Sequence, residues 1–206
     1  MKFRNEEKLR IVNSKIFQLK EWVNKNDGFE LYPNRLINSV YFDNNNYSMF
    51  NESVEGITPR KKIRLRTYDK EFNYNNKANK EIKITSVEGR YKISESVYDT
   101  SKLLKLGIYD NNYGLCVPVL NIVYERSYFR IKDIRLTIDK NIAYKKFSNG
   151  KISNFSTVDN YNIVELKYDV RQSVDYVIKN FPFERVRFSK YCRGIEFTRL
   201  NYCNEI

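Results

Sequence analysis

The chain contains no histidine, and this absence excludes more chemistry than any other feature of its composition. Histidine is the commonest general base and is part of every Ser-His and Cys-His nucleophile arrangement, so acyl-transfer chemistry is not expected. Only three cysteines occur, Cys116, Cys192 and Cys203, and none of them has CxxC spacing. Their odd number and spacing predict neither a disulfide framework nor a zinc site, and favour a reducing, cytoplasmic setting.

Glycine, proline and long apolar runs are also scarce. Only 7 Gly and 4 Pro occur among 206 residues, and no Gly-, Ser- or Pro-rich linker divides the chain. This length suits one well-buried domain, so residues 1–206 are predicted to form a single domain. The N-terminal sequence MKFRNEEKLR lacks an apolar signal region, and no segment approaches the ~20 apolar residues of a membrane-spanning helix. We therefore expect no membrane segment in this chain.

Positive charge, by contrast, is abundant. Lys and Arg total 37 and Asp and Glu 25, which gives a formal net charge of +12. Such an excess favours anionic partners: nucleic acid, phosphorylated metabolites, polyphosphate or an acidic membrane surface. Because 41% of the residues are hydrophobic and 15% aromatic, the chain is too apolar to be disordered. A folded protein with an anionic ligand is therefore expected.

Alternating polar and apolar residues predict an antiparallel sheet with a few helices. The predicted fold class is α+β, built on a large sheet or barrel. Apolar residues at helical spacing predict helices over 9–25, 101–107 and 170–181, and a further helix is expected just after Lys190. Strands are expected over 37–42, 61–68, 80–85, 119–130, 133–139 and 161–169.

The stretch RKKIRLRTY (60–68) places four cations on one face of a strand: Arg60, Lys62, Arg64 and Arg66. Other predicted strands repeat this pattern. Two unit charges ~4 Å apart interact by about 4 kcal/mol at an effective dielectric near 20, so converging cations need carboxylates, water or a bound polyanion. Two interpretations remain open. The cations lie either on solvated outer faces of an ordinary sheet, or in the basic lumen of a barrel that binds a phosphate chain.

Eight charged motifs follow one another along the chain: FRNEEKLRI (3–11), INSVYFD (37–43), GITPRKKIRLRTY (56–68), KEIKIT (80–85), PVLNIVYERSYF (118–129), IRLTID (134–139), VELKY (164–168) and RFSKYCRGI (187–195). Together they resemble the polyphosphate-polymerase domain of the vacuolar transporter chaperone (VTC) proteins, within the triphosphate tunnel metalloenzymes. The triphosphatase and cyclase relatives begin with an E-x-E-x-K strand, whereas this chain has Arg4, Glu6 and Lys8. That departure favours the VTC type.

The resemblance implies an eight-stranded antiparallel β-barrel, a triphosphate tunnel with a basic lumen covered by a few helices. It implies transfer of the γ-phosphate of ATP to a growing inorganic polyphosphate chain, with Mn²⁺ or Mg²⁺ as the metal. Inorganic triphosphate and pyrophosphate are expected ligands, nucleic acid is not, and the sequence identifies no membrane-protein partner. The resemblance assigns catalytic contacts to Arg64, Arg66, Lys83, Arg126 and Arg135, phosphate binding to Lys8, Arg187 and Lys190, and the metal to Glu165. Arg60, Lys62 and Lys167 join the phosphate-binding set on strand parity alone.

Three functions are compatible with these residues. The first is the polymerase, the second a tunnel triphosphatase that hydrolyses inorganic or nucleoside triphosphate, and the third a non-catalytic module that binds polyphosphate or inositol polyphosphate. Glu165 disfavours the third because an anion binder needs no metal ligand, although an internal salt bridge to Lys167 or Arg66 is the alternative role for this residue. A general nucleic-acid binder is less favoured, because the cations lie at strand centres and not in a basic tail. Tyr41 alternates with strand charges and fits either the core or the site.

Overall fold

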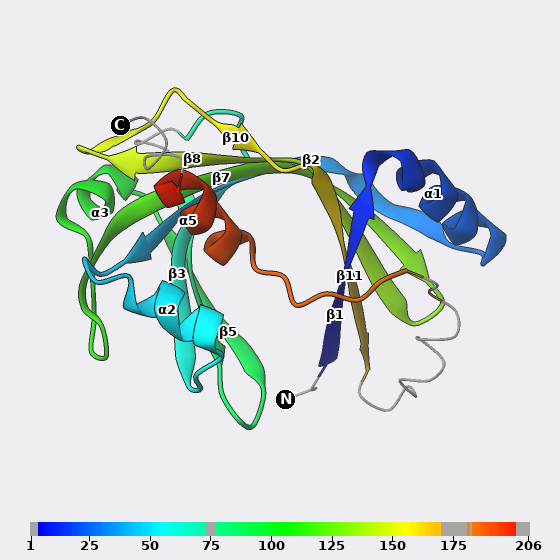
Figure 1. Ribbon diagram of the computed structural model, residues 1–206, viewed down its shortest axis with the longest axis horizontal. Coiled ribbons are helices and arrows are strands. Elements are labelled where there is room, and N and C mark those ends of the chain that lie inside the picture. The colour runs from blue at the N-terminus through cyan, green and yellow to red at the C-terminus, as the bar shows by residue number, and fades with distance from the viewer. Residues whose placement is uncertain (1–3, 73–76, 170–180, 182, 201–206) are drawn as a thin grey trace. The chain divides into compact units, whose positions relative to one another are not determined.

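The computed structural model describes residues 4–72, 77–169, 181 and 183–200 of the chain. Within these residues an antiparallel sheet and four α-helices form the predicted α+β fold (Figure 1). No helix in this part of the chain is long and apolar enough to cross a bilayer. The helices are α1 (Ile16–Lys25), α2 (Ser48–Glu55), α3 (Thr100–Leu106) and α5 (Lys190–Leu200), and a 3₁₀ turn precedes α1 at Asn13–Lys15.

Eight strands follow one path of hydrogen-bonded neighbours, in the order β1-β11-β8-β7-β2-β3-β4-β5. The strand number on this path agrees with the predicted fold class, and β1 and β5 are its two ends. Short strands β6, β9 and β10 pair beside it, β6 with β7 and the other two with β8. The strands are β1 (Arg4–Val12), β2 (Phe29–Asp43), β3 (Arg60–Thr67), β4 (Ala78–Thr85), β5 (Arg90–Val97), β6 (Ile108–Asp110), β7 (Gly114–Ile131), β8 (Ile134–Ser148), β9 (Lys151–Ile152), β10 (Thr157–Val158) and β11 (Tyr161–Asp169).

The chain divides into two compact units, each assembled from three segments. Unit 1 consists of Met1–Arg35, Tyr124–Ile142 and Asp159–Phe188, and unit 2 consists of Leu36–Val123, Ala143–Val158 and Ser189–Ile206. The long strands β2, β7 and β8 therefore each contribute residues to both units. The assignment of one domain to residues 1–206 stays a prediction.

The core of unit 1 is the apolar face of β1, β11 and β8, on which α1 packs. β1 pairs antiparallel with β11, so that Leu9 lies opposite Val164 in the ladder. From α1, Ile16, Leu19 and Val23 join the same apolar cluster at helical spacing. A ten-residue helix is marginal by itself in water, so burial of this face, more than helix propensity, stabilises α1.

The helix predicted over 9–25 is wrong in its first seven residues. Residues 9–12 complete β1, and Asn13–Lys15 form the 3₁₀ turn. Leu9 and Val12 continue the helical spacing of Ile16, but every residue of β1 has a ladder partner in β11, and this tertiary pairing decides the structure. The helices at 100–106 and after Lys190 are confirmed, whereas α2 and β5 were not predicted. The helix predicted over 170–181 lies, except for Phe181, outside the described residues.

Unit 2 has strands with one polar and one apolar face. On β3, Ile63 and Leu65 are fully buried, and the cations alternate with them as predicted. Helix α5 packs on β7 and β8 at Gly194, where an added Cβ would lie 2.6 Å from side-chain atoms of both Leu120 and Tyr144. A side chain at Gly194 would therefore push α5 away from the sheet.

Asp43, the last residue of β2, fixes the start of α2. Its carboxylate accepts hydrogen bonds from the backbone N–H groups of Asn44 (2.8 Å), Met49 (3.1 Å) and Phe50 (3.0 Å), and from the hydroxyl of Tyr191. The first N–H groups of a helix have no partners within the helix, so this carboxylate satisfies groups that would otherwise be left unpaired. Asp43 is fully buried, and burial raises the pKa of its carboxyl group.

Candidate functional site: two polar networks

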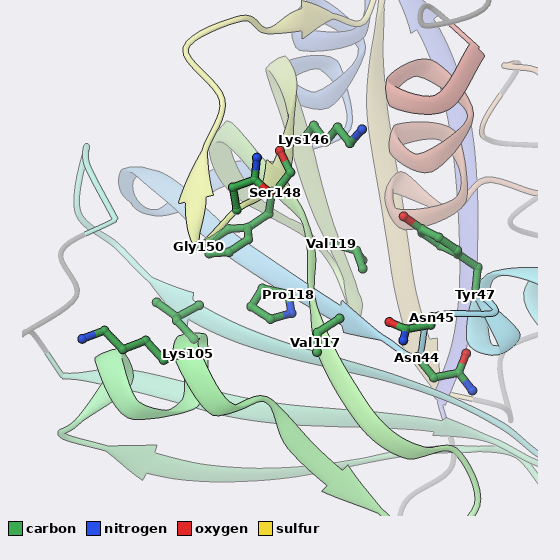
Figure 2. Close-up of a pocket in the computed structure, with 13 residues that line it drawn as sticks. Asn44, Asn45, Tyr47, Lys105, Val117, Pro118, Val119, Lys146, Ser148 and Gly150 are labelled. Atoms are coloured by element: carbon green, nitrogen blue, oxygen red, sulfur yellow. The ribbon is translucent and has the colours of Figure 1, made fainter.

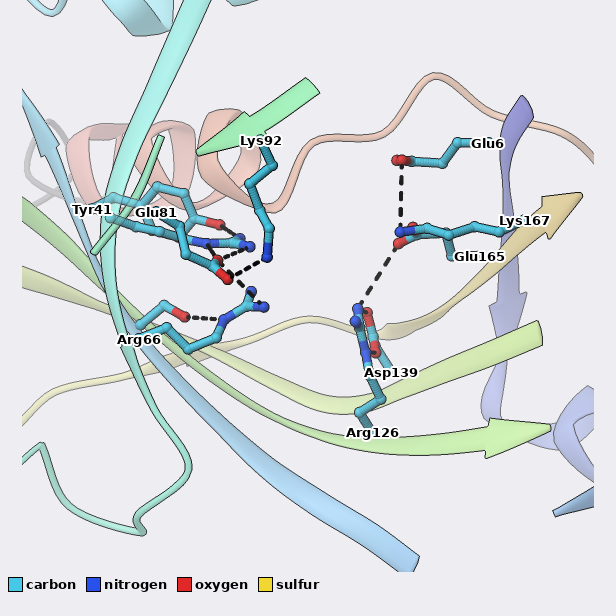
Figure 3. A network of polar contacts seen from close by, with 11 residues as sticks. Glu6, Tyr41, Arg66, Glu81, Lys92, Arg126, Asp139, Glu165 and Lys167 are labelled. Atoms are coloured by element: carbon cyan, nitrogen blue, oxygen red, sulfur yellow. Dashed lines mark hydrogen bonds and ion pairs between the residues drawn. The ribbon is translucent and has the colours of Figure 1, made fainter. Parts of the chain in front are cut away.

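The first polar network lies in unit 2 and centres on Glu81 of β4 (Figure 3). The Glu81 carboxylate accepts a hydrogen bond from Arg64 Nε at 2.7 Å, and a second Arg64 nitrogen, Nη2, lies at 2.6 Å. Lys92 Nζ of β5 donates at 2.8 Å, and Arg66 Nη1 lies 3.6 Å away. Arg66 also donates from Nε to the hydroxyl of Ser39 at 3.3 Å. We call these residues, with Tyr41, the Glu81 network.

Cations outnumber the carboxylate in this network. Burial by itself raises the pKa of Glu81, but the guanidinium groups of Arg64 and Arg66 overcome that effect and lower the pKa to about 2. Glu81 is therefore ionised at neutral pH, and Arg64, Arg66 and Lys92 all lie against its one negative charge. The remaining positive charge suits a bound polyanion, because Arg can give a phosphate group two parallel charge-assisted hydrogen bonds.

Tyr41 belongs to the Glu81 network as well as to the core. Its hydroxyl oxygen accepts a hydrogen bond from Arg64 Nη1 at 2.7 Å, and its ring stacks on Tyr191 with centroids 5.2 Å apart. Burial raises the pKa of the Tyr41 phenol, but Arg64 and Arg66 lower it, and the net pKa is below its ordinary value. A phenol made more acidic in this way is a stronger hydrogen-bond donor toward an anion.

Two ladder positions further along, three lysines face one another on neighbouring strands. Lys62 of β3 lies opposite Lys83 of β4, and Lys83 lies opposite Lys92 of β5. Residues directly opposite in an antiparallel pair have Cβ atoms about 4.5–5.5 Å apart. Lys62 Nζ donates to the hydroxyl of Ser189 at 2.9 Å, and burial, with the nearby charge of Lys83, lowers its pKa. This row extends the excess of positive charge beyond the Glu81 network.

The other two predicted residues of unit 2 are the first residues of β3 and of α5. Arg60, at the start of β3, donates from Nη1 to the backbone oxygens of Gly56 (3.3 Å) and Ile57 (2.8 Å), just after α2. Lys190 is the first residue of α5, and its charge is one of those that lower the pKa of Tyr41.

The second network lies in unit 1 and centres on Glu165 of β11 (Figure 3). Lys167 Nζ lies 2.7 Å from the Glu165 carboxylate and 3.9 Å from that of Glu6. Arg126 binds Asp139 through two nitrogens at 2.5 and 2.8 Å, and its Nη2 is 3.9 Å from Glu165. The Glu165 network consists of Glu6, Lys8, Arg126, Asp139, Glu165 and Lys167.

Carboxylates and cations are equal in number in the Glu165 network. Burial raises the pKa of Glu165, but Lys167 and Arg126 lower it, and the result lies well below the usual range of a glutamate. Lys8 lies 3.7 Å from Glu6 and donates to the backbone oxygen of Phe188 at 2.7 Å. The salt bridge to Lys167, which the sequence left open as an alternative for Glu165, is therefore present.

Two further predicted cations of unit 1 are not part of this network. Arg135 of β8 lies opposite Lys167 in the ladder with β11, and its guanidinium lies over the ring of Tyr128, 5.6 Å from the centroid. Arg187 is exposed, in the segment that follows the pairing of Arg185 with Leu9 of β1.

Sequence reasoning missed two members of the Glu81 network. Lys92 was missed because β5 (RYKISESV) was not predicted as a strand, although Tyr91 and Ile93 alternate with its polar residues. Ser39 was missed because a serine hydroxyl beside strand charges has no distinctive pattern. The sequence would have placed Lys92 on the same face as Lys83 only if the pairing of β5 with β4 were known.

The residues around Glu165 could hold a divalent metal ion only together with a phosphate ligand. Among the described residues no group of three or more His, Cys, Asp or Glu side chains could hold a metal ion. Glu165 offers carboxylate oxygens, the ligand type that Mg²⁺ and Mn²⁺ prefer, and Lys167 already neutralises it at 2.7 Å. Mg²⁺ is commonly bound by one or two carboxylates together with substrate phosphates and water. The donor set fits an ion that arrives with phosphate, and does not fit an ion held by protein alone.

A separate open cavity of about 640 Å³ occurs in unit 2 (Figure 2). It is lined by Asn44, Tyr47, Lys105, Pro118, Lys146 and neighbouring residues, and no predicted site residue is among the described residues that line it. The predicted site residues therefore lie outside the lining of this cavity.

The family model of the VTC domain matches residues 3–199 of the chain. This match confirms the predicted resemblance. A comparison with curated proteins found no significant match.

Solved structures with this fold share little sequence with the chain. A Vibrio parahaemolyticus protein described as a proposed adenylate cyclase has a TM-score of 0.55 at 13% identity, over 95% of this chain and 98% of its own. A conserved hypothetical protein from Pyrococcus furiosus also has a TM-score of 0.55, at 12% identity over 92% and 99%. A Hippeastrum protein, described as a proposed adenylyl cyclase with a dominant triphosphatase activity, has 0.52 at 13% over 94% and 96%. At these identities the similarity establishes the fold alone.

Proposed function

The chain belongs to the VTC domain family, and from this premise we propose that it is an ATP-dependent polyphosphate polymerase. It transfers the γ-phosphate of ATP to the end of a growing inorganic polyphosphate chain. The observation that carries the proposal is the excess of cations on the polar strand faces of unit 2. Lys62, Arg64, Arg66, Lys83 and Lys92 lie around the single carboxylate of Glu81 or in the adjacent row.

Phosphate binding accounts for the gathering of these cations on neighbouring strands. Arg64 and Arg66 belong to neighbouring rows on the same face of β3, roughly 7 Å apart along the strand, so they can hold successive parts of one phosphate chain. Glu81 binds both guanidinium groups and fixes their orientation before substrate arrives. Such preorganised donors stabilise developing charge without reorganisation during the reaction.

In unit 1 the proposed roles are divided between anion and metal. Lys8, Arg126, Arg135 and Lys167 bind phosphate oxygens, with Arg187 as a further contact. Glu165 would hold a Mn²⁺ or Mg²⁺ ion, which would neutralise negative charge on the phosphate oxygens when bound. Lys167 and Arg126 keep Glu165 ionised, because they lower its pKa, and a carboxylate ligand must be ionised.

The proposed reaction needs no histidine. An ionised oxygen of the terminal phosphate of the acceptor forms a bond to the γ-phosphorus of ATP. The bond from that phosphorus to the β,γ-bridging oxygen breaks, and ADP leaves with the electron pair. Since the attacking oxygen is already ionised at neutral pH, the protein has to position it and neutralise charge, and no general base is required.

The test is a product analysis. The protein is incubated with ATP and Mn²⁺, and the products are separated by gel electrophoresis. Long phosphate chains would support the polymerase. Inorganic phosphate as the sole product would identify a triphosphatase, and tight binding without turnover would identify a non-catalytic polyphosphate-binding module. Either of the last two results would overturn the proposal. A cytoplasmic setting stays a prediction.

A further inference from the structure

Unit 1 contains a cluster of aromatic rings and guanidinium groups in addition to the Glu165 network. Tyr32 of β2 and Tyr128 of β7 meet edge to face, with ring centroids 5.7 Å apart and an interplanar angle of 83°. The guanidinium of Arg35 lies over both rings, 5.6 Å from the Tyr32 centroid and 5.9 Å from that of Tyr128. Arg135 lies over Tyr128 at 5.6 Å. We call these four residues the Tyr32 cluster.

The Tyr32 cluster presents flat groups to solvent. Tyr32 is 48% exposed, whereas Tyr128 is only 6% exposed because it forms the base of the cluster. Arg35 and Arg135 are both exposed. A half-exposed ring beside guanidinium groups held over a second ring is a surface on which a planar, electron-rich ligand can stack.

The cluster adjoins the residues that we assign to phosphate binding in the same unit. Arg135 lies opposite Lys167 in the β8–β11 ladder, and Lys167 binds Glu165. On β7, Tyr128 follows Arg126 by two residues, so both side chains leave the same face of the strand, roughly 7 Å apart. A ligand with an anionic part and a planar part would find the two matching surfaces next to each other.

We propose that the Tyr32 cluster binds the nucleobase of a nucleoside triphosphate, with the base stacked on Tyr32 and on the adjacent guanidinium planes. The inference rests on the proposed function, because it assigns the nucleoside part of the donor whose phosphates that function requires. Every base has a flat face that can stack, so the cluster should favour nucleoside triphosphates over inorganic triphosphate without selecting a particular base. Purines have the larger ring system, so they should stack more strongly than pyrimidines. A polyphosphate chain has no planar group and would contact only the arginines.

The experiment compares ligands in one set of variants. Dissociation constants for ATP, CTP and inorganic triphosphate are measured by titration calorimetry with the wild type, Tyr32→Ala, Tyr32→Phe and Arg35→Lys. We expect Tyr32→Ala to weaken ATP binding about tenfold, since one base on one aromatic ring contributes on this order. Inorganic triphosphate should stay within about twofold, and the preference for ATP over CTP should disappear. Tyr32→Phe, which keeps the ring, should bind ATP as the wild type does.

Two further variants separate stacking from charge and from general surface effects. Arg35→Lys keeps the charge but loses the planar group, so it should weaken ATP and leave inorganic triphosphate unchanged. Phe17→Ala removes another exposed aromatic ring of unit 1, 71% exposed on α1, and should change neither ligand. Melting curves establish that each variant is folded.

The outcomes distinguish this inference from the proposed function. If the wild type binds ATP and inorganic triphosphate but Tyr32→Ala leaves ATP binding unchanged, or weakens both ligands equally, the base-stacking assignment is wrong and the proposed function stands. If the wild type binds neither ligand, the proposed function fails and the inference fails with it.

Discussion

The Glu81 network and the Glu165 network are built from the same kinds of residue but have different charge balances. In unit 2, one carboxylate faces Arg64, Arg66 and Lys92, and the row of Lys62 and Lys83 adds further positive charge. In unit 1, the carboxylates of Glu6, Asp139 and Glu165 match Lys8, Arg126 and Lys167 one for one. Counting only the residues named here, cations outnumber carboxylates in the first network, which we call the incomplete set, and the two are equal in the second, the complete set.

This difference indicates two ways to bind phosphate. An incomplete set gains from any polyanion, because the ligand relieves repulsion between cations that the fold holds together. A complete set gains little from an anion alone, since its charges already balance, but it can accept an anion together with a cation. We therefore expect the Glu81 network to respond to phosphate itself and the Glu165 network to respond to metal and phosphate together.

The largest expected effect is that of Arg66→Ala in the Glu81 network. Loss of a preorganised donor to developing charge typically reduces turnover by about 10²–10³-fold, and we expect at least this loss here. The variant should remain folded, because its neighbours keep the ion pair of Arg64 with Glu81. Turnover is measured with ATP and Mn²⁺, beside Lys80→Ala, which removes a lysine of β4 paired with exposed Glu95. Wild-type activity in Arg66→Ala would remove Arg66 from the site.

Glu165→Gln should distinguish the role of the Glu165 network from that of the Glu81 network. The substitution removes the proposed metal ligand, and we expect the Mn²⁺ concentration for half-maximal activity to rise by about 10–100-fold, the range for residues that support a metal site. Binding of inorganic triphosphate without metal should be unchanged or tighter, since Lys167 loses its partner at 2.7 Å. Glu125→Gln, an exposed carboxylate of β7, is the matched control. An unchanged metal dependence in Glu165→Gln would contradict the metal assignment.

The contribution of Glu81 to the free energy of unfolding should depend on pH between about 4.5 and 2. The pKa of Glu81 is lowered to about 2 in the folded protein, so its contribution is complete above the unfolded value near 4.5 and is lost as pH falls toward 2. This difference corresponds to about 3 kcal/mol at neutral pH. Glu81→Gln has no such group to titrate, so the gap in unfolding free energy between it and the wild type should narrow between pH 4.5 and 2.

Urea unfolding of the wild type and Glu81→Gln at pH 6, 4 and 3 measures that gap. Glu95→Gln, which removes an exposed carboxylate paired with Lys80, should cost about 0–1 kcal/mol throughout. A gap that stays constant with pH would mean that Glu81 is not stabilised by the cations around it.

Inorganic triphosphate without metal should stabilise the wild-type fold. At about 100 times its dissociation constant a ligand adds about 2.7 kcal/mol, which for a chain of this size raises the melting temperature by very roughly 5–10 °C. Arg64→Ala should reduce the shift more than Lys8→Ala does, because we expect metal-free anion binding mainly in the incomplete network. Equal reductions in the two variants would show that charge balance does not distinguish the networks.

The sequence predicts the faces of strands better than the contacts between them. Alternation on β3 correctly separated the cations from buried Ile63 and Leu65, because a two-residue period determines the side on which each residue lies. Which carboxylate would bind Arg64 depends on the register of β3 with β4, in which Arg64 lies opposite Glu81. Register depends on the whole sheet and is not readable from either strand alone.

Local patterns failed where tertiary pairing overrides them. Residues 9–12 have apolar spacing that fits a helix, yet they pair with β11 over the full length of β1. Strand β5 was missed although its residues alternate, and all eight of them pair with β4 while seven are exposed. Glu165 and Lys167 were close enough in sequence for a salt bridge to be foreseen, because side chains two apart on a strand share a face.

In the short motif Tyr41–Asp43, loss of activity alone would not show which role a residue has. Tyr41 bonds a cation of the Glu81 network, while Asp43 holds the first turn of α2 and the Tyr191 hydroxyl of α5. A loss-of-function screen would return both positions with the same phenotype. Tyr41→Phe keeps the buried ring and its stacking on Tyr191, so it is expected to keep a wild-type melting profile, whereas Asp43→Asn is expected to lower the melting temperature. Thermal denaturation would therefore distinguish loss of a ligand contact from loss of the fold at these two positions.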